Sequence, residues 1–158
     1  MLSKAFRRED ISFTLKMDLL QAAVFSVFLY GSETWTLSQN ILDGADVFQR
    51  KCYRVLLGIN WKQHVSNVEL YARVRELSPQ AELLSTTICN RQKRWLGHAI
   101  RSPNPLLSTY ALYNPQFGRR GRGRPRETHM HAFANYVLGQ PELTEANIRE
   151  LAQQRGTW

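Results

Sequence analysis

The order of hydrophobic and polar positions along the chain predicts helices and almost no strand. From about Ile11 to Tyr30, apolar residues recur at helical spacing, and further apolar residues make the segment hydrophobic nearly all round. The recurring positions are Leu15, Leu19, Ala22, Ala23, Ser26 and Tyr30. Such a helix needs protein on most of its sides, so we expect it to pack against something larger than this chain. Gly31 and Ser32 end it.

Two more helices are predicted before the middle of the chain. Ser38 is a suitable N-cap for the first of them, and Gly58 is its expected stop. Its apolar stripe consists of Ile41, Ala45, Phe48, Cys52 and Leu56. A short helix then opens at Ser66, which forms a capping box with Glu69, and it is expected to end near Arg75.

A long fourth helix combines an apolar face with positive charge. Ser78 is its expected N-cap, and it continues to about Arg101 before a proline-rich turn. Helical geometry places Leu84, Ile88, Trp95 and Ala99 on one face, and Arg91, Arg94, His98 and Arg101 on the adjoining face. No acidic residue is expected nearby to pair with these arginines, so they are candidates for binding an anionic partner. The alternative is a surface helix whose arginines are only solvated.

The rest of the chain predicts a linker and a small helical end. Residues 103–127 contain Pro103, Pro105, Pro115 and an Arg/Gly tract, which are typical of an extended, semi-rigid connector. Two helices are expected at about 128–138 and 142–154. The sequence therefore predicts an all-α fold with a helical bundle at 1–102, a basic connector at 103–127 and a C-terminal helical pair at 128–158.

Composition sets the compartment and the size of the core. A chain of 158 residues with 43% hydrophobic content can form one modest domain with a core and a basic tether. Cys52 and Cys89 have no close cysteine partner, so we expect no disulfide framework and a reduced, intracellular protein. The longest apolar stretch, from Leu19 to Tyr30, is shorter than the roughly 20 residues that span a bilayer. We expect no membrane partner.

The distribution of charge predicts a nucleic-acid partner. The formal net charge is +8, and no Asp or Glu occurs from Leu83 to Arg126. The same stretch carries Arg91, Lys93, Arg94, Arg101, Arg119, Arg120, Arg122, Arg124 and Arg126. Lys and Arg that neutralise phosphates release counterions, which favours binding to a polyanion. The core Arg122-Gly-Arg-Pro125 matches the AT-hook pattern for narrow minor grooves, although such tracts also serve as solvated linkers or localisation signals.

The sequence predicts neither a metal site nor a cofactor. Cys52, Cys89, His98, His129 and His131 include no closely spaced pair of the kind that structural zinc sites use. Cys52 is expected to fill core space, and His98 to donate a hydrogen bond or to touch phosphate. Among the aromatic residues, Trp61, beside Lys62 in a loop, is the best candidate for base stacking, whereas Trp95 is expected to pack the long helix onto its neighbours.

Five blocks in order give a family resemblance. They cover residues 30–37, 50–59, 94–101, 118–126 and 151–158. The chain resembles the region after the polymerase palm in endonuclease/reverse transcriptases of non-LTR, LINE-like retrotransposons of the RTE kind. The resemblance covers nearly the whole chain. It implies a thumb-like bundle and a basic tail that grip template RNA, primer DNA or their hybrid, with the polymerase core of a parent element as a possible partner and residence in the nucleus or in a cytoplasmic ribonucleoprotein.

The catalytic motifs of that family are missing from this chain. A reverse transcriptase needs paired Asp residues that hold two metal ions. The only close pair here, Asp43 and Asp46, is three residues apart on a predicted helix, with no Phe/Tyr-x-Asp-Asp turn. The chain also lacks the length and strand pattern of the endonuclease. We therefore expect a non-catalytic nucleic-acid-binding fragment.

Two other classes of function stay open at this point. A DNA-binding regulator would use the helix from Ser66 and the basic helix as a helix-turn-helix beside the AT-hook-like tract. However, the arginines lie too far along the second helix to be the residues that read bases. A protein-interaction remnant without activity would use the apolar first helix to pack on a missing partner.

Overall fold

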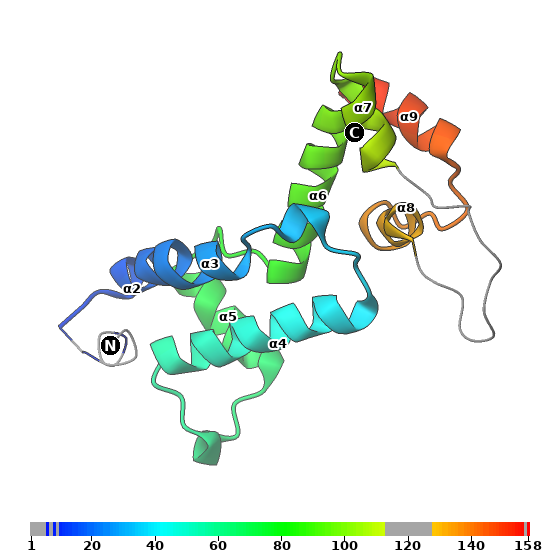
Figure 1. Cartoon of the computed structure of the whole chain (residues 1–158). Helices are drawn as coiled ribbons and strands as arrows, with labels where there is room; N and C mark the ends of the chain where they lie inside the picture. The colour runs from blue at the N-terminus through cyan, green and yellow to red at the C-terminus, as the bar shows by residue number, and fades with distance from the viewer. Residues whose placement is uncertain (1–5, 7, 9, 113–127, 157) are drawn as a thin grey trace. The chain divides into compact units, whose positions relative to one another are not determined.

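The structure is a computed structural model that describes residues 6, 8, 10–112, 128–156 and 158. The described residues form helices and turns and no strand, which confirms the predicted all-α fold (Figure 1). They divide into two compact units, one formed by Met1–Tyr30 with Asp43–Thr86 and the other by Gly31–Leu42 with Thr87–Trp158. The predicted domain boundaries at residues 102 and 127 stay a prediction. The two compact units divide the chain at other positions.

The apolar N-terminal segment forms one helical run with a π-helical middle. It consists of α2 (Phe13–Leu20), η1 (Gln21–Phe25) and α3 (Ser26–Phe28), and Gly31 follows with a φ of +68°. The buried positions are Met17, Leu20, Phe25 and Leu29, so the predicted stripe is wrong. The π-helical turn adds a residue, so the next buried position after Leu20 is Phe25, five residues later, and the buried face carries the larger side chains. No helix in the described part of the chain is both long and apolar enough to cross a membrane.

Helix α4 (Gln39–Leu56) begins and ends where the sequence predicts. The carbonyl of Ser38 accepts the first backbone bonds, and Gly58 has a φ of +63°. The Ile59 N–H donates to the Arg54 carbonyl and the Gly58 N–H to the Val55 carbonyl, which is the Schellman pattern. The predicted apolar stripe is partly wrong, because Ile41 is exposed while Gln49 and Tyr53 are buried.

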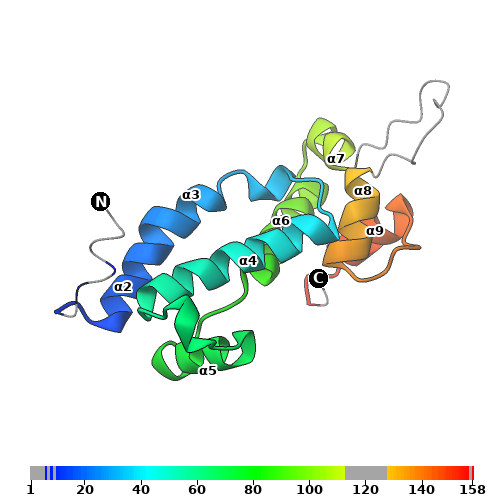
Figure 2. The same ribbon diagram turned by 90° about the horizontal axis from the view of Figure 1, so that it is seen from below.

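Aromatic rings join the N-terminal helices to α4, and the two lie side by side in both ribbon views (Figures 1 and 2). Phe28 stacks on Phe48 at a centroid distance of 4.8 Å. Phe25 meets Phe48 and Tyr53 edge to face at 6.3 and 6.4 Å. Pairs of this kind add about 0.5–1.5 kcal/mol each to the burial of their surfaces, so they hold this unit together.

Helix α5 (Asn67–Leu77) begins at the predicted N-cap. The Ser66 hydroxyl accepts from the Glu69 N–H at 3.2 Å. The Glu69 carboxylate accepts from Arg73 at 2.6 Å, an ion pair four residues apart, so the expected reciprocal half of the capping box is replaced. The helix ends two residues later than predicted, and Tyr71 lies edge-on to Tyr53 at 6.3 Å.

Helix α6 (Leu84–Arg101) begins later than predicted, because its N-terminus is capped from α4 rather than by Ser78. Asp46 accepts from the Ser85 N–H at 3.0 Å and from the Ser85 hydroxyl at 2.8 Å. The buried Gln49 side chain accepts from the Leu84 N–H at 3.3 Å and donates to the Glu82 carbonyl at 2.7 Å. Two N–H groups at the start of α6, which have no partner within the helix, are thus bound by side chains distant in sequence.

The second unit surrounds the C-terminal part of α6. The chain continues through α7 (Pro105–Ala111), α8 (His129–Ala132), η4 (Phe133–Val137) and α9 (Glu145–Gln153). Its core comprises Leu96, Ala99, Ile100, Ala111, Leu112, Phe133, Ala134, Ile148 and Ala152. The C-terminal helical pair is confirmed. The predicted connector is wrong before residue 113, because the Asn104 side chain caps α7 and Pro105 occupies its first position.

Candidate nucleic-acid interface

A buried glutamine positions the acidic member of the site. Gln92 of α6 is fully buried, and its Nε2 donates to the Ser32 carbonyl at 3.0 Å and to the Trp35 carbonyl at 2.8 Å. These bonds hold the turn η2 (Ser32–Thr34) on α6 within the second unit. Glu33 is therefore next to the basic face of the helix, although it is far away in sequence.

The basic face of α6 lines an open depression of about 580 Å³. Its walls are Glu33, Arg91, Arg94, Trp95 and His98, and we call them the α6 cluster. Three of the four predicted residues of the arginine stripe thus surround one surface feature. Trp95 is half-buried and also packs against the core of this unit, as the sequence predicts.

The charged side chains of the α6 cluster differ in how readily they can bind a phosphate. Arg91 Nη1 donates to Glu33 Oε1 at 3.3 Å, so the expectation that no acidic residue lies near is wrong. The sequence signal failed because the pair is 58 positions apart. Arg94 and His98 are exposed, and their side chains have no hydrogen bond or ion pair to any described residue. Arg94 is the cation of this cluster that a phosphate can reach without competition.

Arg101 does not line the depression of the α6 cluster, and its side chain contacts α9 instead. Its Nη1 donates to the carbonyl of Ala152 in the last turn of α9. A cation at this end of a helix satisfies an orphan carbonyl and interacts favourably with the helix dipole. Arg101 therefore ties α9 to α6, and its expected phosphate contact stays a prediction.

Trp61 lies in a short ordered turn of the first unit. The turn η3 (Trp61–Gln63) is fixed by a reciprocal capping box between Asn60 and Gln63. The Trp61 side chain is 79% exposed, and the Lys62 ammonium lies 5.8 Å from its ring centroid. The exposed ring suits the expected base stacking, which stays a prediction. The predicted sites Arg119, Arg120, Arg122, Arg124 and Arg126 lie outside the described residues.

The other candidate chemical groups have structural contacts. The Cys89 thiol donates to the Tyr136 carbonyl at 3.6 Å, and burial raises the pKa of Cys52. Burial lowers the pKa of His129. Both oxygens of the Asp46 carboxylate bind Ser85. Within the described ranges, no three residues of the types His, Cys, Asp or Glu are grouped so that they could hold a metal ion.

The α6 cluster offers donors and one aromatic edge, an arrangement suited to binding an anion. Arg94 can donate to phosphate oxygens from its guanidinium, and His98 follows one turn later on the same face. Glu33 can only accept hydrogen bonds when ionised, so it opposes a phosphate at that edge. No family model, curated protein or solved structure matches the chain significantly.

Proposed function

We propose that this chain is a non-catalytic nucleic-acid-binding module that contacts RNA, DNA or their hybrid chiefly through phosphates. The observation that carries the proposal is the distribution of charge, since no Asp or Glu occurs from Leu83 to Arg126 while the net charge is +8. Phosphate contacts of this kind supply most of the affinity of non-specific binding. We expect little sequence preference.

Two surface features support this proposal. Arg94 and His98 are exposed and line one open depression with the ring of Trp95. Trp61 offers a second aromatic surface with Lys62 beside it. An aromatic ring with a neighbouring cation is the combination that single-strand binders use.

We further propose that the chain derives from the thumb and basic tail of a non-LTR retrotransposon reverse transcriptase. What supports this is the resemblance of five sequence blocks, which include the residues of the α6 cluster from Arg94 to His98. On this view the natural ligand is template RNA, primer DNA or their hybrid, and the protein acts in the nucleus or in a cytoplasmic ribonucleoprotein. Preference for hybrid or RNA over duplex DNA at equal length would support it.

A helix-turn-helix regulator is a poorer explanation of the same residues. A recognition helix reads bases through its N-terminal residues. The N-terminus of α6 is instead bound by Asp46 and Gln49, and a carboxylate at that position repels phosphate. The connection from Ser78 to Leu83 is also longer than the three to four residues that are typical of the motif.

A protein-interaction role is the second candidate, and one observation favours it. The N-terminal helical run leaves an apolar face in solvent, with Leu15 50%, Val27 73% and Tyr30 86% exposed. Large apolar side chains that stay in solvent are candidates for contact with a partner. Sedimentation of the wild-type chain and of Val27→Lys across a range of concentrations tests it. Self-association that the substitution removes supports an exposed interaction face, and a wild-type monomer throughout removes that support.

The experiment that tests the main proposal compares three charge variants. Fluorescence anisotropy with a single-stranded RNA measures the Kd of wild type, Arg94→Gln, Glu33→Gln and Arg73→Gln. Arg73→Gln is the matched control, because it removes one exposed arginine that Glu69 already neutralises, in the other unit. We expect Arg94→Gln to weaken binding and flatten the salt slope by about one unit, and Glu33→Gln to tighten binding.

The variants also show how the proposal fails. Equal affinities for Arg94→Gln and Arg73→Gln would mean that only the total charge matters and that the α6 cluster is not at the interface. An unchanged or weaker affinity for Glu33→Gln would contradict the repulsion argued above. Circular dichroism at 222 nm checks that each variant keeps its helices.

A further inference from the structure

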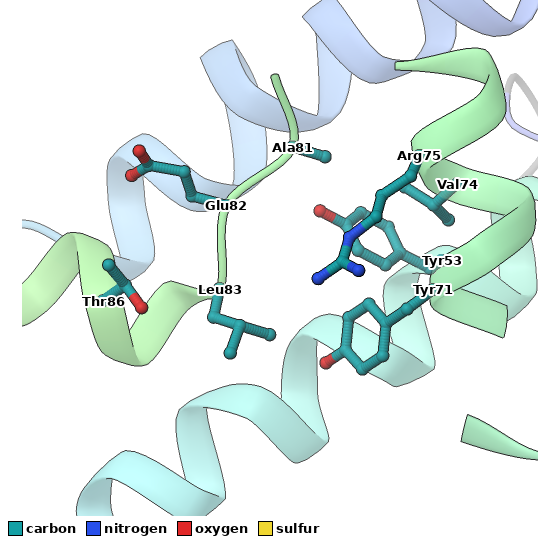
Figure 3. A pocket seen from close by; sticks show the side chains of 8 residues that line it. All are labelled: Tyr53, Tyr71, Val74, Arg75, Ala81, Glu82, Leu83 and Thr86. Carbon is teal, nitrogen blue, oxygen red and sulfur yellow. The ribbon is translucent and has the colours of Figure 1, made fainter. Parts of the chain in front are cut away.

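A small pocket in the first unit is separate from the α6 cluster. It has a volume of about 270 Å³ and lies between α4, α5 and the segment that leads into α6 (Figure 3). The residues around it are Tyr53, Tyr71, Val74, Arg75, Ala81, Glu82, Leu83 and Thr86. All of them belong to one compact unit, so the pocket does not depend on the placement of the other.

Tyr53, Tyr71 and Arg75 present hydrogen-bond donors on one side of this pocket, and Thr86, whose hydroxyl can donate or accept, also lines it. The Tyr71 hydroxyl is buried and has no partner among the described residues. The Tyr53 hydroxyl accepts from Gln49 Nε2 at 3.0 Å, which leaves its own proton to donate. Burial raises the pKa of Tyr53 to about 12, so this phenol keeps its proton at neutral pH. Figure 3 shows the Arg75 guanidinium beside both rings, directed into the pocket.

Acceptors are scarce around the same space. The Glu82 main-chain carbonyl already accepts from Gln49 at 2.7 Å. The Glu82 carboxylate points away from the tyrosines and Arg75 in Figure 3. Val74, Ala81 and Leu83 add apolar wall. A pocket that presents two phenol protons and a guanidinium, with apolar walls, suits a ligand whose polar part only accepts hydrogen bonds.

We propose that this pocket binds a small organic oxyanion, a carboxylate or phosphate group on a compact apolar body. The oxyanion would accept from Tyr71 and Arg75, and the body would lie against Val74, Ala81 and Leu83. A buried hydroxyl without a hydrogen-bond partner is destabilising, and a bound acceptor would remove that cost. The pocket volume is just below the lower end of the usual range for small-molecule sites, so the body is small.

Arg75 has the freedom that such a site needs. Its side chain is exposed and makes no hydrogen bond or ion pair with a described residue, in contrast to Arg73 on the same helix. This long, unpaired side chain lies beside both tyrosine rings, so it can turn toward a ligand in the pocket. The guanidinium can then bind the oxyanion through paired N–H groups.

The test is an NMR titration of the full chain with benzoate, phenyl phosphate and neutral benzyl alcohol. Probe concentrations reach about 10 mM, because ligands of few atoms bind weakly. We expect saturable shifts around Tyr71 and Val74 for at least one of the two anions and none for the alcohol. The stronger anion identifies the head group. Binding of neither anion, or equal binding of the alcohol, overturns the proposal.

Two variants and one control assign the binding to this pocket. Tyr71→Phe and Arg75→Gln should each weaken the anion Kd about tenfold, as expected for a lost charge-assisted bond. Arg73→Gln, which removes the same charge nearby, should change it less than twofold. Tyr71→Phe should also fold with unchanged or higher stability, because its hydroxyl has no protein partner to lose. Equal affinities in all three variants would refute the assignment.

Discussion

Replacing Gly97 by alanine is expected to destabilise the protein, although the same change stabilises most helices. A Cβ at this position would lie 2.3 Å from Nε1 of Trp158 and 2.9 Å from its Cε2. Trp158 is held there by a hydrogen bond from Nε1 to the Lys93 carbonyl at 2.8 Å and by stacking on Phe133 at 6.0 Å. The indole has to move away before the methyl group fits.

The magnitude follows from the contacts that the indole would lose. Truncation of a fully buried Trp costs about 3–5 kcal/mol, and Trp158 is half-buried, so we expect a loss of about 2–3 kcal/mol including its hydrogen bond. The gain in helix propensity from glycine to alanine is about 1 kcal/mol. The free energy of unfolding of Gly97→Ala should therefore fall by about 1–2 kcal/mol.

A double-mutant cycle with Trp158→Ala tests this reasoning. Urea unfolding followed at 222 nm gives the four free energies of unfolding, and the indole N–H resonance of Trp158 reports its displacement. In the Trp158→Ala background the sign reverses, and Gly97→Ala should stabilise by about 1 kcal/mol because nothing remains to clash. If Gly97→Ala stabilises the chain that retains Trp158, the indole does not lie on Gly97.

Three further predictions concern stability. Gln49→Leu should lower the free energy of unfolding by about 2–4 kcal/mol, because it leaves the Leu84 N–H and the Glu82 carbonyl without partners, and a urea titration measures this. Gly58→Ala should lower the free energy of unfolding by about 1–2 kcal/mol, since its φ of +63° is strained for alanine. Gly44→Ala should instead stabilise the chain, because Gly44 lies inside α4 with open space around it, and thermal melting measures both changes. Burial lowers the pKa of His129 below 6.5, so protonation favours the unfolded chain. The contribution of His129 to stability should be full above pH 6.5 and should fall as the pH drops toward the pKa in the folded state. His129→Gln should make the free energy of unfolding depend less on pH in this range.

Local signals in the sequence predicted the helices well where neighbouring residues determine them. Ser38, Ser66 and Gly58 begin or end helices as expected, because caps act within a few residues. The start of α6 could not be predicted in this way. Its cap comes from Asp46 and Gln49, which the fold brings to Leu84 and Ser85 from another helix.

The first helix and the α6 cluster show two further reasons why local sequence patterns did not predict the structure. The π-helical turn at Gln21–Phe25 shifts the helical phase, so a regular spacing of apolar residues predicted exposed positions from this turn onward. The arginine stripe was predictable from its period within α6. Its partner Glu33 was not, because the contact depends on Gln92 holding a distant turn. Helix α7 is a different case, because its start has a local signal in the sequence. Asn104 is an N-cap and Pro105 follows it at the first helical position.

The most direct test of the central claim is a salt titration of binding. The purified chain is titrated by fluorescence anisotropy against single-stranded RNA, duplex DNA and an RNA–DNA hybrid of equal length, beside a variant in which Arg119, Arg120, Arg122, Arg124 and Arg126 are serine. We predict tight binding with a steep salt slope, strongest for hybrid or RNA, and a slope that flattens by several units in the variant. No binding at physiological salt would contradict the claim and leave the positive charge as a solvated surface.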